Sequence, residues 1–141
     1  VGRIAVPWAL LAREDELTPG ELASIREYAE VGAELLAQSL DPQQLSWVAM
    51  HLERWDGSGT PSGTVGREIP SGAQIIGIAD TWDALTNERP YRSASSPEDA
   101  LAFIGRARGT AFAPGLVNLF FRVLPQLSPE LSPALPVPAR A

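Results

Sequence analysis

One histidine and two aspartates are the residues of this sequence best suited to metal chemistry. His51 is the only histidine of the 141-residue chain, and cysteine is absent, which excludes thiolate-ligated zinc and iron–sulfur sites. Asp80 and Asp83 stand one helical turn apart, so we expect both carboxylates to face one cleft with His51. Mixed nitrogen and oxygen ligation suits Fe, Mn, Mg or Zn. On spacing alone, a hydrogen-bonded, half-buried histidine and structurally paired carboxylates are the favoured interpretation.

Two further groups of residues are suited to hold a phosphate-bearing ligand. Arg89 and Arg92 flank a proline and a tyrosine, and such a pair can grip phosphate and stack a base. Gly57 and Gly59 let the backbone approach a ligand closely. Both groups also have a structural interpretation, in which the arginines pair with nearby carboxylates and the glycines form a tight turn.

The elements that position these residues are predicted to be helices. Start signals occur at Thr18, Asp41 and Ser96, each a capping residue followed by proline. The predicted helices run from Thr18 to Leu40, from Pro42 to about Trp55, from Ser71 to Thr86, from Pro97 to the closing Gly109, and from Pro114 to Leu124. His51 and Asp80 are thereby each placed on a helix, and Ile75 and Ala79 are expected on a buried face. The glycine-rich segment 56–70 is predicted to be a loop without regular structure.

Composition and charge narrow the class of protein. Hydrophobic residues make up 45% and charged residues 20% of the chain, and the net charge is −6. These values predict one folded domain over residues 1–124 and argue against nucleic-acid binding, which needs a basic face. The apolar run Ile4–Ala12 is too short to span a bilayer, and we expect a cytoplasmic protein without a membrane span. Residues 125–141 form a proline-rich tail that is predicted to be disordered.

Taken together, these motifs resemble the HD-GYP family. The run from His51 to Pro61, HLERWDGSGTP, resembles the HHExxDGxGYP signature of that family. Ile78–Thr86 with Arg89-Pro90-Tyr91-Arg92 resembles the IADxxDALTxxRPYR stretch, and Val1–Pro7 is similar to the segment that follows the HDIGK motif. The resemblance covers residues 1–124 in continuous order.

The resemblance implies an all-α fold, an HD-domain-like bundle of about five helices with a long Gly-rich loop. It also implies a metal-dependent phosphodiesterase that hydrolyses cyclic di-GMP, with Fe or Mn as divalent cofactor if the domain is active and no metal otherwise. The residues carried over from the family are His51 and Asp80 as metal ligands, Arg3 at the HDIGK lysine as a catalytic cation, Arg89, Arg92, Gly57 and Gly59 as ligand-binding residues, and Glu53, Asp56 and Asp83 as supporting residues.

Three departures from the family pattern affect its chemistry. Tyr28 stands at the histidine of the HPxxG pattern, Leu52 at the second of the paired histidines, and Thr60 at the GYP tyrosine. The chain also starts directly after the place where the HD dipeptide would stand. The leading hypothesis is therefore a degenerate, non-catalytic signalling domain that binds a cyclic dinucleotide or a partner domain of the GGDEF or receiver type.

Two alternatives remain open from the sequence. In the first, a His-Asp pair upstream of Val1 completes a mononuclear phosphodiesterase site with His51 and Asp80. In the second, the domain is a structural relic that packs against a neighbouring domain, which predicts oligomerisation when it is alone.

Overall fold

The computed structural model describes residues 18, 20, 28–88 and 93–129. In these ranges the chain is helical, and its only extended pairing is an isolated bridge between Arg108 and Phe112. The assigned elements are α3 (Tyr28–Leu35), α4 (Pro42–Ala49), the 3-10 helix η2 (Gly66–Glu68), α5 (Ser71–Thr86), α6 (Pro97–Arg106) and α7 (Pro114–Leu127). The all-α fold with five helices is confirmed for this part of the chain.

Two of the predicted helix starts are confirmed by their caps. At the start of α4, the Asp41 carboxylate accepts from the Gln44 backbone N–H at 2.8 Å, while the Gln44 side chain accepts from the Asp41 N–H at 3.2 Å. At the start of α6, the Ser96 hydroxyl accepts from the Asp99 N–H at 3.1 Å. These contacts satisfy backbone donors that the first helical turn leaves unpaired.

Four of the predicted helix ends are wrong; one of them is Gly109, because α6 ends at Arg106. Residues 36–40 form turns after α3 instead of extending it, and their N–H groups include i-to-i−3 hydrogen bonds. The second helix ends at Ala49, because the Glu53 N–H bonds to the Met50 carbonyl and draws the chain into a tighter turn. His51 is therefore in a turn and not on a helix. The segment predicted to lack regular structure contains η2, and α7 continues through Pro125 to Leu127.

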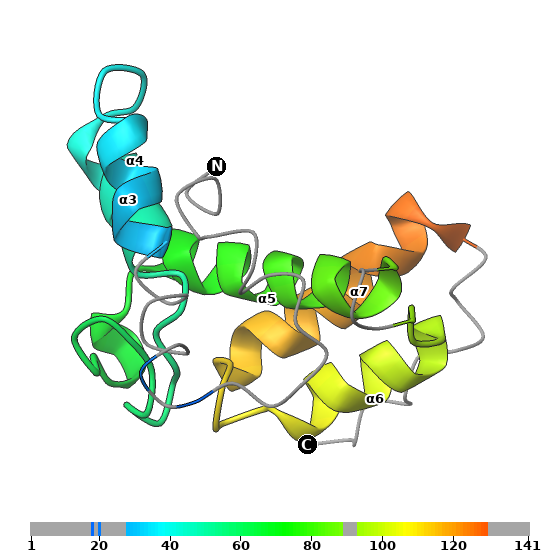
Figure 1. Cartoon of the computed structure of the whole chain (residues 1–141). Coiled ribbons are helices and arrows are strands. Elements are labelled where there is room, and N and C mark those ends of the chain that lie inside the picture. The colour runs from blue at the N-terminus through cyan, green and yellow to red at the C-terminus, as the bar shows by residue number, and fades with distance from the viewer. Residues whose placement is uncertain (1–17, 19, 21–27, 89–92, 130–141) are drawn as a thin grey trace.

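Helix α5 is the central element of the described structure. In Figure 1 the α3–α4 pair lies at one end of α5, whereas α7 runs along α5 and α6 lies beyond α7 towards the other end. Two glycines let α5 approach α4: a Cβ on Gly72 would collide with the Trp47 ring, and a Cβ on Gly77 would come within 2.7 Å of the His51 carbonyl oxygen. Close packing on this side buries Gly77, one of the three buried residues of α5 together with Ala73 and Ile78.

The predicted buried face of α5 is wrong for the same reason. Ile75 is 52% exposed, and Ala79 is exposed as well. Helical periodicity in the sequence identified an apolar stripe, but α5 contributes its smallest residues to the helix contact. Ile75 and Ala79 instead line an apolar groove of about 200 Å³ along α7.

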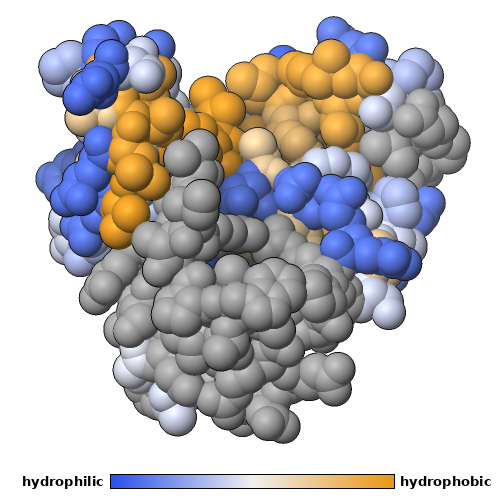
Figure 2. Space-filling view, turned by 45° about the horizontal axis from the view of Figure 1, so that its top comes forward, coloured by the Kyte–Doolittle hydropathy of each residue, from blue (hydrophilic) through white to orange (hydrophobic). Residues whose placement is uncertain are grey.

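The hydrophobic core lies between α5, α6 and α7. Its buried members are Ile78, Ile104, Phe112 and Val117. Trp82 packs edge-on against Phe120 at this core, with ring centroids 5.8 Å apart. Figure 2 shows hydrophobic surface on the two upper lobes of the molecule, with hydrophilic side chains between them. Among the helices described, none combines the length and apolarity that crossing a bilayer requires.

Candidate functional site

The glycine-rich loop is organised by one buried carboxylate. Glu53 is 7% exposed. Its Oε1 accepts from the Ser62 N–H at 2.6 Å and its Oε2 accepts from the Thr64 N–H at 3.1 Å. A buried carboxylate needs such donors, and each charged hydrogen bond stabilises the loop more than a neutral one would. Glu53 thus holds the loop in place with both oxygens.

Two glycines are required by the path of this loop. Gly57 has φ +81°, and a Cβ there would come within 2.7 Å of Val65 Cγ2. Gly59 lies against the backbone of the preceding segment, so that a Cβ would fall 2.5 Å from Glu53 Cα. The loop therefore folds back onto residues 53 and 54, and any side chain at Gly59 would push it away.

A cavity of about 270 Å³ lies between this loop, α5 and the turn that follows α6. Its walls combine polar groups from the loop and α5 with apolar groups from α6 and the residues after it. They are His51, Leu52, Glu53, Arg54, Ser58, Gly59, Thr60, Gly77, Asp80, Thr81, Phe103, Ala111 and Phe112. Backbone hydrogen bonds from Trp55 N–H to Ala111 O at 3.1 Å and from Asp56 N–H to Thr110 O at 2.9 Å fix the loop against the turn.

Both ring nitrogens of His51 have protein partners. His51 is 8% exposed, and its Nδ1 lies 2.6 Å from the Val48 carbonyl oxygen. A carbonyl only accepts, so Nδ1 carries the hydrogen, and the lone pair of Nε2 faces the Tyr28 hydroxyl at 3.0 Å. Anchoring of Nδ1 on a backbone carbonyl is also typical of metal-ligating histidines. Here the hydroxyl of Tyr28 occupies the direction in which Nε2 would bind a metal.

The two aspartates of α5 are separated by the structure. Asp80 lines the cavity together with His51. Asp83 is exposed and is not among the cavity residues; its Oδ1 accepts from the Asn87 side-chain amide at 2.8 Å. The expectation that both carboxylates face the same cleft with His51 is therefore wrong, because the next turn of α5 has already left the cavity wall.

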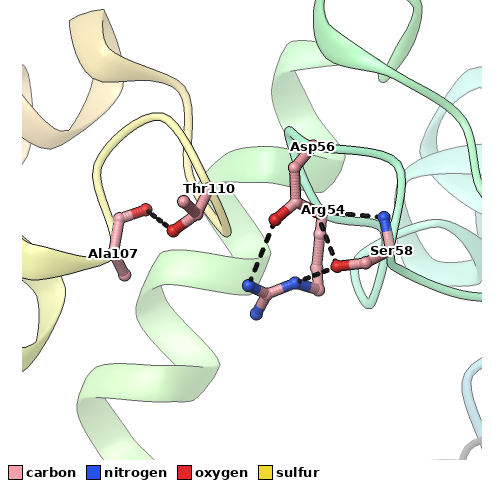
Figure 3. A network of polar contacts seen from close by, with 5 residues as sticks. All are labelled: Arg54, Asp56, Ser58, Ala107 and Thr110. Atoms are coloured by element: carbon pink, nitrogen blue, oxygen red, sulfur yellow. Dashed lines mark hydrogen bonds and ion pairs between the residues drawn. The ribbon is translucent and has the colours of Figure 1, made fainter.

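Arg54 is the centre of a polar network at the cavity (Figure 3). Its Nε donates to the Ser58 hydroxyl at 2.7 Å, and its Nη2 lies 3.5 Å from Asp56 Oδ2. Asp56 Oδ1 accepts from the Ser58 hydroxyl at 2.6 Å and from the Ser58 N–H at 3.0 Å. These two bonds from Ser58, with a smaller contribution from Arg54, hold the pKa of Asp56 below its ordinary value of 3.8.

Among the described residues, the metal-ligating donors at this cavity are too few to hold a metal ion by themselves. Within residues 28–88 and 93–129, no three His, Cys, Asp or Glu side chains are grouped in a way that would hold one. The candidate ligands are His51, whose Nε2 is bonded to Tyr28, and Asp80. Leu52 adds an apolar wall where a second imidazole would be needed. Two ligands are fewer than the N/O sites of Fe, Mn or Zn use.

The predicted site residues thus fall into three groups. The cavity brings together His51, Leu52, Glu53, Gly59, Thr60 and Asp80, while Tyr28 reaches it through His51. Gly57, Asp56 and Asp83 do not line it. Arg3, Arg89 and Arg92 lie outside the described residues.

Arg54, Ser58 and Phe103 also line the cavity, and no sequence pattern pointed to a role for them. A signal for Ser58 was present, because Asp-Gly-Ser is a pattern typical of a turn closed by the aspartate side chain. Once that turn is assumed, Ser58 must lie near Asp56, and Arg54 is the nearest cation in sequence. Phe103 carried no comparable signal, since its approach depends on how α6 packs.

Comparison with known families gives a clear match. The family model described as "HD domain" matches residues 1–116. The chain belongs to the HD domain family. The family resemblance drawn from its motifs is confirmed at this level, and the helical architecture agrees with it.

Named relatives of this HD domain are cyclic-dinucleotide phosphodiesterases. The "Cyclic di-GMP phosphodiesterase response regulator RpfG" of Xanthomonas campestris is 38% identical over 130 residues, which cover 90% of this chain and 34% of that protein. A "Cyclic di-GMP phosphodiesterase" of Thermotoga maritima is 34% identical over 126 residues, covering 87% of this chain and 34% of that protein. The "3'3'-cGAMP-specific phosphodiesterase 2" of Vibrio cholerae is 34% identical over 122 residues, which cover 84% of this chain and 23% of that protein. The chain spans about a third or less of the length of these relatives.

Proposed function

We propose that this chain is a non-hydrolysing HD domain that binds a cyclic dinucleotide of the cyclic di-GMP class in the cavity beside α5. The observation that carries the proposal is the hydrogen bond of 3.0 Å between the Tyr28 hydroxyl and His51 Nε2. Because that nitrogen is engaged, the one imidazole of the chain is a structural group. The named relatives supply the class of ligand.

The composition of the cavity wall supports ligand binding without chemistry. Arg54 provides a cation and Phe103 provides an aromatic surface. These two groups match the phosphate and the base of a nucleotide. A volume of about 270 Å³ lies just below the usual range of ligand sites, so we infer that the cavity receives one nucleotide of the ligand and leaves the other outside.

The test measures binding and metal occupancy on the 141-residue chain. Titration calorimetry with cyclic di-GMP should give a saturable binding curve for the protein as purified, and elemental analysis after exposure to Fe²⁺ or Mn²⁺ and desalting should give well under one metal per chain. The matched variant is Tyr28→His/Leu52→His, which restores two imidazoles at positions where the family pattern has them. We expect this variant to retain metal.

Two results would overturn the proposal. The first is a wild-type chain that retains stoichiometric metal which is lost in His51→Ala, and the second is an absence of binding to cyclic di-GMP under conditions in which the protein is folded. The second candidate is an enzyme in which a His-Asp pair upstream of Val1 completes a site with His51 and Asp80, and metal retained by the chain with its upstream sequence and lost in His51→Ala would favour it. The geometry that favours this candidate is the Nδ1 anchor of His51 on the Val48 carbonyl.

A further inference from the structure

Arg54 is a cation at the cavity to which the family resemblance assigns no role. We propose that Arg54 binds a phosphate group of the ligand and that Asp56 and Ser58 are positioning residues that hold its guanidinium in place. The proposal rests on the proposed function, because it assumes that the cavity is where the ligand binds. It names the residue that recognises the charged part of that ligand.

The guanidinium of Arg54 retains unused donors. A guanidinium has five N–H donors. It makes two contacts: Nε donates to Ser58 Oγ at 2.7 Å, and one N–H of Nη2 faces Asp56 Oδ2 at 3.5 Å. No other acceptor among the described residues bonds to it, and its side chain is 42% exposed. In Figure 3 its free end points away from Ser58, towards the side on which Ala107 and Thr110 lie. The remaining donors are thus available to a phosphate, which a guanidinium can bind with two parallel hydrogen bonds.

The neighbouring carboxylates do not cancel this charge. Asp56 makes its short bonds to Ser58, at 2.6 and 3.0 Å, and only a long contact to Arg54. Glu53 directs both oxygens at backbone N–H groups of the loop, at 2.6 and 3.1 Å. The side chain of Arg54 is therefore oriented by its neighbours without being fully neutralised by them.

The wall opposite Arg54 narrows the class of ligand. Asp80 lines the same cavity from α5, and its carboxylate repels a phosphate on that side. A ligand that fits therefore has its phosphate at Arg54 and an uncharged part, such as a ribose or a base, in the rest of the cavity. Phe103, at 45% exposure, offers its ring to the base. A nucleotide meets these requirements and free phosphate does not.

The experiment compares charge-matched variants of the full chain. Binding of cyclic di-GMP, GMP and inorganic phosphate is measured by calorimetry at several salt concentrations for the wild type, Arg54→Ala, Arg54→Lys and Arg122→Ala. Arg122 is an exposed residue of α7 outside the cavity and controls for the loss of one positive charge. We expect Arg54→Ala to weaken cyclic di-GMP binding at least about tenfold, as the loss of a charged hydrogen-bond donor does, and to reduce its salt dependence. The affinity of Arg54→Lys for cyclic di-GMP should lie between those of wild type and Arg54→Ala. The affinity of Arg122→Ala should equal that of wild type within about twofold.

A separate comparison tests the positioning role of Ser58. Ser58→Ala should weaken binding less than Arg54→Ala does, and Ser58→Thr, which keeps the hydroxyl, should restore it. In the Arg54→Ala background, Ser58→Ala should have no further effect, because residues that act through one group are not additive. If Ser58→Ala lowers the affinity equally in the wild-type and Arg54→Ala backgrounds, Ser58 contacts the ligand independently of Arg54. That result would overturn its positioning role.

The outcomes separate this inference from the proposed function. If the wild type binds cyclic di-GMP and Arg54→Ala binds it equally well, the inference is wrong and the proposed function stands. If the wild type binds no cyclic di-GMP, both fail. If inorganic phosphate binds as tightly as the nucleotides, the assignment of a nucleotide is wrong. Thermal unfolding is used to check that each variant is folded. If Arg54→Ala does not fold, the comparison of Arg54→Lys with wild type tests the role of Arg54.

Discussion

The hydroxyl of Tyr28 determines what His51 can do. A histidine with Nδ1 on a backbone carbonyl presents Nε2 for ligation or proton transfer. In this chain that nitrogen accepts from Tyr28 at 3.0 Å, and the two rings pack with their centroids 5.5 Å apart. The chemistry of the site therefore depends on a residue 23 positions away in sequence.

Removing that hydroxyl tests its contribution to stability. Tyr28→Phe leaves the buried Nε2 of His51 without its partner, so the free energy of unfolding should fall by about 1–2 kcal/mol. Urea denaturation of both proteins measures the change. Ser46→Ala, which removes an exposed hydroxyl that donates to the Gln43 carbonyl on α4, serves as the control and should stay within about 0.5 kcal/mol of wild type. Equal stability of Tyr28→Phe and wild type would contradict the geometry.

The lowered pKa of Asp56 predicts a pH dependence. A carboxylate whose folded-state pKa lies below its ordinary value of 3.8 stabilises the fold above that value and loses this contribution as pH falls through the folded pKa. Wild type should therefore be more resistant to urea than Asp56→Asn at pH 7 and pH 5, and the difference should shrink below about pH 4. If the difference in urea resistance between wild type and Asp56→Asn stays constant down to pH 3, the charge of Asp56 is not the source of its stabilising effect.

At the scale of elements, the site depends on how closely α5 passes the end of α4. Gly77 makes this approach possible, since its backbone lies against the His51 carbonyl. The contact brings the turn after α4 and the Asp80 face of α5 to the same cavity. The glycine costs α5 intrinsic helix stability, and the tertiary contact offsets that cost.

Gly77→Ala tests the packing of α4 on α5. The new Cβ would meet the His51 carbonyl oxygen at 2.7 Å, so we expect a loss of about 1–3 kcal/mol of unfolding free energy together with weaker ligand binding. Gly115→Ala on α7 is the matched control, because a Cβ there meets nothing within 4 Å. Chemical denaturation of both variants provides the comparison. A Gly77→Ala protein as stable as the control would mean that the two elements can separate without cost.

Sequence patterns predicted elements better than the contacts between them. The caps at Asp41 and Ser96 were predicted because capping is local chemistry. The end of α4 was not predicted, because no local sequence signal near Met50 indicates the turn that contains His51. The buried face of α5 was also mispredicted, because small residues that allow close packing carry little hydrophobic signal.

For the whole molecule, sequence predicted the fold class and the family but only part of the site. The motifs identified the segments that meet at the cavity, namely residues 51–60 and the Asp80 turn of α5. The substitution of Tyr28 was noted in the sequence, but its contact with His51 requires the packing of α3 on α4. Arg54 was likewise part of a motif, and its role depends on the fold of the loop over it.

For the domain as a whole, we predict recognition of a cyclic dinucleotide without turnover. The most direct measurement is chromatographic quantification of cyclic di-GMP after prolonged incubation with an excess of the 141-residue chain, in the presence of Fe²⁺ or Mn²⁺, in a sample for which binding has been measured. We expect the cyclic dinucleotide to be recovered intact. Accumulation of the linear dinucleotide or of GMP at a rate that depends on protein concentration, and its loss in Asp80→Ala, would contradict this prediction.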